Sequence, residues 1–147
     1  MYVISACLLG ENCKYNGGNN DCQAVHKLAE SVHVVPVCPE VAGGLPIPRP
    51  PAELRNGPDE RRVINREGAD VTEAFARGAR LEWERVQKEA EKLGEPIECA
   101  VLRKGSPTCG SGKIYDGTFT KKMISGDGVF AALLKENGIK VITEEEL

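Results

Sequence analysis

Short, mostly apolar runs alternate with amphipathic stretches along the chain. Four runs of five or six residues have the continuous hydrophobic character of strands that are buried on both faces of a sheet. Between them, apolar residues recur at intervals of three and four, which is the spacing of a helix with one buried side. The predicted strands cover residues 2–6, 33–38, 98–102 and 139–143, and the predicted helices cover residues 21–31, 70–93 and 128–138.

The order of these elements predicts the fold class. Strands alternate with helices from the first predicted strand to the last, which indicates an α/β fold: a three-layer, Rossmann-like open sheet, mainly parallel, of about four strands with flanking helices. A length of 147 residues suits a single domain over residues 1–147. Right-handed crossovers bring the carboxyl ends of such strands to one edge, where ligands bind.

The ends of the longest predicted helix carry recognisable signals. Asp70 and Glu73 have the spacing of a capping box, and Gly94 marks the end of the helix. Residues 38–60 contain no comparable periodicity and read as one long loop, either functional or disordered. Because this segment lacks a serine- and glutamine-rich bias, an ordered functional loop is favoured.

Two segments near the end of the chain read as surface structure. The sequence "YDGTF" at 115–119 predicts a hairpin. The sequence "ITEEEL" at 142–147 reads as a solvated acidic tail. The glycine-rich sequences "GSGKIYDG" at 110–117 and "GDG" at 126–128 do not match the spacing of a phosphate-binding loop and read as turns.

Composition and charge exclude several classes of partner. The formal net charge is −3, so no overall basic excess points to nucleic acid or an anionic membrane, although a local contact of Arg61-Arg62 or Lys121-Lys122 with RNA stays open. The first ten residues lack the charged start of a signal peptide, and no apolar run approaches the ~20 residues that span a bilayer. We therefore expect a soluble cytoplasmic protein.

The six cysteines are the strongest chemical signal. In a reducing compartment they are not expected to form structural disulfides, which leaves metal binding, redox or nucleophilic chemistry, and buried thiols. Cys7, Cys38 and Cys109 each follow an apolar run and precede glycine-rich or proline-rich backbone, so metal ligation is favoured for these three. Cys22 and Cys99 are assigned to packing. Cys13 reads as a fourth ligand or as a redox partner of Cys7.

The spacing of the thiols favours iron over zinc. No C-x-x-C pair is present, and His26 and His33 read as structural residues. Three widely separated thiolates suit an iron–sulfur cluster with one iron left open, and an open iron is a Lewis acid.

Four motifs together resemble the thiouracil desulfidase family: "ISACLLGENCKYNGG", "CPEVAGGLPIPRPPAE", "KGSPTCGSGKIYDGTF" and "GVFAALLKENGIKVITEE". The resemblance runs from Tyr2 to the C-terminus. It implies a [4Fe-4S] cluster held by Cys7, Cys38 and Cys109, without Cys13. It also implies functional roles for Glu40 and Ser106, and non-redox removal of sulfur from a thiolated pyrimidine.

The predicted mechanism combines these residues. The open iron binds the thiocarbonyl sulfur, Glu40 activates a water that attacks the adjacent carbon, and Ser106 orients that water or relays a proton. Arg49 and Lys104 are candidates for contacting an anionic part of the substrate, although an exposed basic side chain is the favoured interpretation of both. Tyr15 and Asn16 are placed near the pocket without roles.

Two alternatives stay open at this point. One is an iron–sulfur sensing or binding module without turnover. The other is a metal-free sulfurtransferase with a cysteine nucleophile, either Cys109 or the Cys7–Cys13 pair. The expected partner is a thiolated nucleobase, a nucleoside or a thiolated RNA position, and the sequence does not give the oligomeric state.

Overall fold

A parallel sheet of four strands forms the centre of the molecule. The structure is a computed structural model that describes residues 1–56 and 61–147. The strand order is β2-β1-β5-β8, and every pair in the sheet is parallel. Their bounds are β1 (Tyr2–Ser5), β2 (Val34–Val37), β5 (Cys99–Leu102) and β8 (Val141–Thr143). This arrangement confirms the predicted α/β fold with a mainly parallel sheet.

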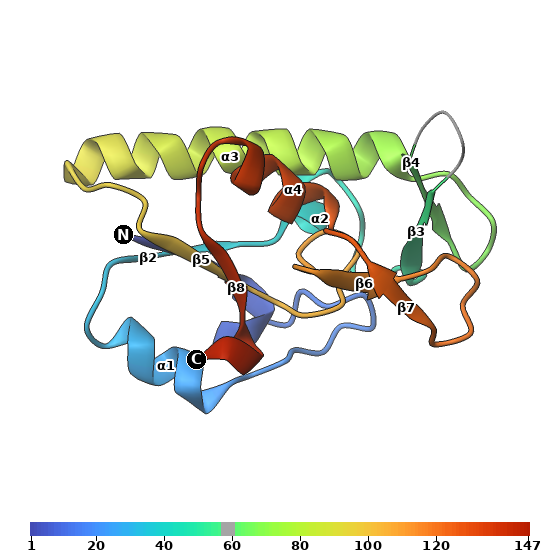
Figure 1. Ribbon diagram of the computed structural model, residues 1–147, viewed down its shortest axis with the longest axis horizontal. Helices are drawn as coiled ribbons and strands as arrows, with labels where there is room; N and C mark the ends of the chain where they lie inside the picture. Colours follow the sequence, from blue (N-terminus) through green and yellow to red (C-terminus); the bar gives the residue numbers. More distant parts are fainter. Residues whose placement is uncertain (57–60) are drawn as a thin grey trace.

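Helices cover both faces of the sheet and give three layers (Figure 1). The long helix α3 (Thr72–Leu93) lies on one face together with α4 (Val129–Glu136) and the short α2 (Pro39–Ala42). Helix α1 (Gln23–Ala29) lies on the opposite face. Two 3₁₀ helices, η1 (Ala6–Leu9) and η2 (Glu144–Glu146), directly follow β1 and β8.

The alternation of side chains along each strand explains the two cores. Val3 and Leu102 pack with α3 and α4, in a cluster that includes Val86 and Phe130. Their strand neighbours Ile4 and Val101 point to the other face and pack with Leu8 and Val25. Both faces are therefore apolar, which is why the strands appear in the sequence as continuous hydrophobic runs.

Two antiparallel hairpins lie to one side of the parallel sheet (Figure 1). The first pairs β3 (Ala52–Asn56) with β4 (Arg61–Asn65), and the second pairs β6 (Lys113–Tyr115) with β7 (Met123–Ser125). The second confirms the hairpin predicted at 115–119, although its connecting loop is longer than that motif.

The prediction of one loop over residues 38–60 is wrong where α2 and β3 lie, and residues 43–51 between them are irregular. Pro39 occupies the first turn of α2, where a missing N–H costs nothing, and β3 begins soon after the prolines at 50 and 51. The prolines of this segment obscure both elements in the sequence, because proline is typical of loops but also fits the first turn of a helix and the start of a strand. Residues 57–60 of the predicted loop lie outside the described residues.

Two smaller predictions are also corrected by the structure. Helix α3 begins at Thr72, whose N–H donates to Asp70 Oδ1, so the capping box of Asp70 and Glu73 does not form. Gly94 ends the helix in the left-handed conformation, as predicted. The acidic end is not a free tail, because Glu144 pairs with Arg103 at 2.6 Å and its side chain is only 9% exposed.

The helices carry no membrane-spanning segment in the part of the chain that the structure describes. The single domain over residues 1–147 stays a prediction.

Candidate active site

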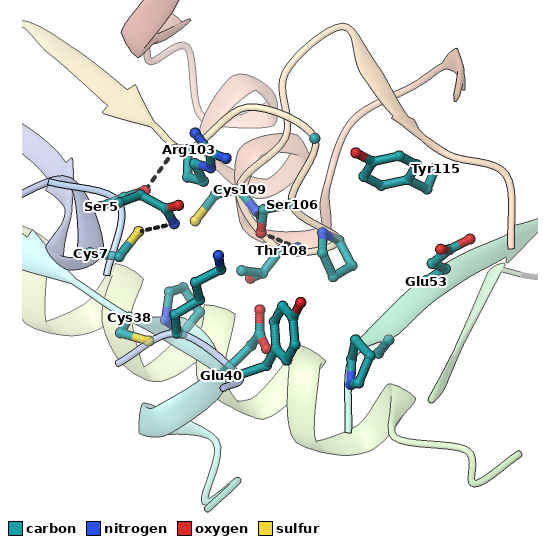
Figure 2. A pocket seen from close by; sticks show the side chains of 18 of the residues that line it. Ser5, Cys7, Cys38, Glu40, Glu53, Arg103, Ser106, Thr108, Cys109 and Tyr115 are labelled. Atoms are coloured by element: carbon teal, nitrogen blue, oxygen red, sulfur yellow. Dashed lines mark hydrogen bonds between the residues drawn. The ribbon is translucent and has the colours of Figure 1, made fainter. Parts of the chain in front are cut away.

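Three cysteines follow three neighbouring strands of the sheet. Cys7 lies in η1 directly after β1, Cys38 lies between β2 and α2, and Cys109 lies in the loop between β5 and β6. Because β2, β1 and β5 are adjacent and parallel, their carboxyl ends meet at one edge. Figure 2 shows the three sulfur atoms around a common space, and all three residues line the same cavity.

The loop of Cys109 is fixed by the start of α4. The first amides of that helix have no partners within it, and they donate instead to carbonyls of the loop: Val129 N to Pro107 O at 3.0 Å and Phe130 N to Thr108 O at 2.8 Å. Gly128 lies so close to the loop that an added Cβ would be 2.5 Å from Thr108 C. The helix therefore determines where Cys109 is held.

Cys38 is anchored from the other side by α3. Its N–H donates to Glu82 Oε2 at 3.0 Å, and the buried Glu82 carboxylate is held in turn by Arg85, whose Nε lies 2.8 Å from Oε1. The thiol of Cys38 lies 3.9 Å from Cys13 O. The neighbouring thiols Cys38 and Cys13 also share a hydrogen bond, which lowers the pKa of Cys38 to about 7 and, together with burial, raises that of Cys13.

Burial dominates the protonation of the other two thiols. It raises the pKa of Cys7 and, more strongly, that of Cys109. Each thiol also has a polar neighbour that opposes this effect: Asn20 Nδ2 lies 3.5 Å from Cys7 Sγ, and the Ser5 side chain hydrogen-bonds to Cys109. Thiolates at these positions need nearby positive charge, which a bound metal centre supplies.

Glu40 is paired inside the site. Its side chain is 15% exposed, and Arg49 Nε donates to Glu40 Oε1 at 3.0 Å. Burial raises the pKa of Glu40, and the guanidinium of Arg49 only partly offsets this effect. Arg49 also donates to Cys13 O at 2.8 Å and is itself buried. The expectation of an exposed Arg49 is wrong, since its side chain ties the Glu40 turn to the loop of Cys13.

Ser106 closes the turn that presents Cys109. Its Oγ accepts hydrogen bonds from Thr108 N at 3.2 Å and from Cys109 N at 3.0 Å. Both contacts use the oxygen as acceptor, so the hydroxyl hydrogen can donate elsewhere. Ser106 therefore has a structural role in the turn and also lines the cavity.

The cavity that these residues share has a volume of about 390 Å³. Glu40 and Ser106 line it together with the three cysteines and Cys13. Tyr15 and Lys104 line it as well, and Lys104 forms an ion pair with Glu145. Lys121 is exposed and also lines the cavity.

The donor set fits an iron–sulfur cluster better than a single ion. Within residues 1–56 and 61–147, no three His, Cys, Asp or Glu side chains converge closely enough to bind one metal ion. A four-iron cluster distributes its thiolates over different irons and needs them farther apart. Among the described residues, Thr108 Oγ1 is buried and has no hydrogen-bond partner, and Thr108 lines the cavity, which leaves this hydroxyl available to a bound cluster.

Comparison with known protein families shows the family to which this chain belongs. The 2-thiouracil desulfurase family matches residues 2–146. This chain belongs to that family. It is 39% identical to the uncharacterized protein YbbK of Bacillus subtilis (strain 168) over 153 residues, which cover 100% of this chain and 97% of YbbK. A solved structure of the [4Fe-4S]-dependent thiouracil desulfidase TudS is 41% identical with a TM-score of 0.82, covering 99% of this chain and 91% of TudS.

Sequence reasoning missed the residues that hold the site of this family member in place. Glu82 reads as one of many charged residues of a long helix, and Ser5 reads as part of a buried strand. Neither has a local signal, because their partners lie 44 and 98 residues away in the sequence. The packing roles of Cys22 and Cys99 are confirmed, since Cys22 packs against the core on one face of the sheet and Cys99 is buried.

Proposed function

We propose that this protein removes sulfur from a thiouracil-like thiolated pyrimidine by a non-redox, hydrolytic reaction. The net change replaces a thiocarbonyl by a carbonyl, consumes one water and releases hydrogen sulfide. The observation that carries the proposal is that Cys7, Cys38, Cys109 and the Glu40 carboxylate share one cavity in a member of the 2-thiouracil desulfurase family. The [4Fe-4S] dependence of TudS supports the choice of cofactor.

Cys7, Cys38 and Cys109 are the proposed ligands of the [4Fe-4S] cluster. When bound, such a cluster supplies an open iron, which as a soft Lewis acid matches a thiocarbonyl sulfur. Three ligands of the chain leave that iron free of protein. Cys13 is not proposed as a ligand, because the resemblance to the family implies three cysteine ligands without it.

Glu40 is the proposed general base. In its ionised form the carboxylate takes a proton from the attacking water, a role typically worth about 10²–10⁴-fold in rate. Arg49 holds the carboxylate through Oε1, which leaves Oε2 to accept that proton. Burial raises the pKa of Glu40, so taking up the proton converts the disfavoured buried charge into a neutral carboxyl and makes the carboxylate a stronger base.

Ser106 is proposed to orient the water or to relay the proton. Its oxygen is fixed by two amides of its own turn, so its hydroxyl hydrogen has a restricted position. A fixed donor at the wall of the cavity lowers the entropy cost of aligning a water against the substrate. This role adds to the structural role in the turn.

Anaerobic reconstitution with iron and sulfide, followed by a sulfide-release assay on 2-thiouracil, tests the proposal. The unaltered protein should bind four irons and release sulfide. Cys38→Ala should lose iron, whereas Glu40→Gln should keep iron and lose turnover. Cys22→Ala is the matched control, because Cys22 packs beside α1 away from the cavity. It should keep both properties.

Two other outcomes would replace the proposal. A protein that binds iron but releases no sulfide from any thiolated pyrimidine would support a sensing module. A metal-free protein that still releases sulfide would support a cysteine-nucleophile sulfurtransferase.

A further inference from the structure

The wall of the cavity opposite the cysteines comes from the two hairpins. Figure 2 shows Glu53 and Tyr115 on the far side of the space from Cys7, Cys38 and Cys109. Phe119, in the loop between β6 and β7, also lines the cavity and is half-buried. This wall has no role in the chemistry proposed above.

The backbone of this loop is strained where it faces the cavity. Phe119 has φ 57° and Lys121 has φ 64°, and these are the two positive φ values found at non-glycine residues in the described ranges. Side chains with a Cβ rarely adopt this conformation. Such strain persists only where the surroundings impose it, and it concentrates at functional sites.

Glu53 imposes this conformation. Its Oε1 accepts hydrogen bonds from Gly117 N at 3.0 Å and from Phe119 N at 3.1 Å, so one carboxylate of β3 holds the loop at two points. The loop also lies directly against β3, because a Cβ at Gly117 would be 2.6 Å from Arg55 Cγ. The Glu53 carboxylate therefore holds this loop through Oε1.

The ring of Phe119 is presented at the wall of the cavity. The guanidinium of Arg66 lies 5.5 Å from the ring centroid, a cation–π distance. Arg66 lines the cavity as well. The loop thus places a flat apolar ring, braced by a cation, across from the sulfur-rich side.

We propose that Phe119 stacks on the pyrimidine ring of the substrate and that Glu53 is the positioning residue that holds it there. A pyrimidine with its thiocarbonyl directed at the cysteines has its ring within the remaining space of the cavity. Stacking on an aromatic side chain suits every pyrimidine, because it reads the flat ring and not its substituents. The inference rests on the proposed function, since it names how the same site holds its substrate.

Measurements of substrate affinity separate the stacking role of Phe119 from the removal of sulfur. Loss of a base–aromatic stack weakens binding about 5-fold to 150-fold. Phe119→Leu should therefore raise KM for 2-thiouracil at least about fivefold, with kcat changed less, and should weaken the binding of uracil, measured by calorimetry, by the same factor. Phe119→Tyr keeps the ring and should bind uracil almost as the unaltered protein does.

A double-mutant cycle tests the role of Glu53. Glu53→Ala should raise KM like Phe119→Leu, and combining the two should add little, because Glu53 acts through Phe119. Glu53→Gln keeps an oxygen acceptor for both amides and should restore most of the affinity. Glu67→Ala, at an exposed glutamate after β4, is the matched control and should leave KM unchanged.

The outcomes distinguish the stacking role of Phe119 from the proposed function. If the unaltered protein releases sulfide while Phe119→Leu has unchanged KM and uracil affinity, the stacking role is wrong and the proposed function stands. Additive effects in the cycle would remove Glu53 from its positioning role. An unaltered, iron-loaded protein that releases no sulfide would overturn the proposed function and this inference with it.

Discussion

A single methyl group added at Gly78 should disturb the proposed site from the far side of α2. Gly78 lies in α3 where the backbone of α2 approaches it, and an added Cβ would be 1.8 Å from Pro39 O. An ordinary contact begins at 3.4 Å, so α2 would have to move by about 1.6 Å. Because α2 carries Glu40 and follows Cys38, this shift reaches the base and one of the thiols directly.

The expected costs follow from that displacement. Overpacking of this kind costs about 1–3 kcal/mol, of which the better helix propensity of alanine returns about 1 kcal/mol. A net loss of about 0–2 kcal/mol corresponds to a fall in Tm of up to a few degrees for a chain of this size. A misplacement of about 1 Å can cost about 100-fold in rate, so Gly78→Ala should lose turnover much more than stability.

Thermal melting, iron content and sulfide release, measured on the same anaerobic preparation, check this prediction. Gly94→Ala is the control, because it has a left-handed φ of 66° and nothing within 4 Å of the added Cβ. It should cost about 1–2 kcal/mol and leave turnover unchanged. A Gly78→Ala protein with full turnover and an increased Tm would refute the argument that α2 is held at contact distance by α3.

Three further predictions test how the site is supported. Arg49→Met removes one partner of the buried ion pair with Glu40. We expect a loss of about 3 kcal/mol in unfolding free energy and a sharp fall in kcat, while the iron content is kept. An unchanged melting temperature would contradict the buried pairing. Glu82→Ala leaves the Cys38 N–H without its acceptor, which should cost about 1–3 kcal/mol of unfolding free energy and speed the loss of iron to a chelator. Glu82→Gln keeps an acceptor and should restore both the stability and the iron retention. Equal behaviour of the two variants would show that Glu82 does not anchor Cys38. The hydrogen bond with His33, and then the N-terminal amine, lower the pKa of Glu95 below 4.5 in the folded protein; the unfolded chain then binds more protons in acid, so this stabilisation is complete above pH 4.5 and is lost as pH falls through the lowered pKa. The Tm of Glu95→Gln should therefore fall less steeply than that of the unaltered protein between about pH 5 and 3, and parallel curves would show that Glu95 contributes nothing.

The parallel sheet could be predicted because its strands are buried on both faces. The runs that contain Val3, Val35 and Val101 are mostly apolar, and few structures other than a covered parallel sheet place such runs between helices. The same reasoning placed Cys7 and Cys38 at one edge of the sheet, since both directly follow a strand. Burial requires an apolar residue at each position, so it can be recognised from the local sequence.

The hairpin of β3 and β4 could not be predicted in the same way. Its strands are short, only one face contacts the core through Leu54 and Val63, and prolines precede it closely. The pairing of Arg49 with Glu40 has a related cause. Two charged residues nine positions apart have no helical or strand relationship, so their contact depends on the turn between them, which includes Pro46 and Pro48. Contacts that depend on loop geometry leave no periodic signal.

The backbone conformation of the Phe119 loop also could not be predicted from the local sequence. "YDGTF" correctly predicts a hairpin, but the left-handed conformation of Phe119 follows from a carboxylate 66 residues earlier in the chain. Only the folded arrangement of the two hairpins brings Glu53 to that loop.

The most direct measurement of the central claim is anomalous diffraction at the iron edge from crystals grown without oxygen after reconstitution. The account predicts four iron positions in the cavity, with the sulfurs of Cys7, Cys38 and Cys109 each bound to a different iron and the fourth iron without a ligand from the chain, on the side of Glu40. Iron bound elsewhere, or a fourth iron bound by Cys13, would contradict it.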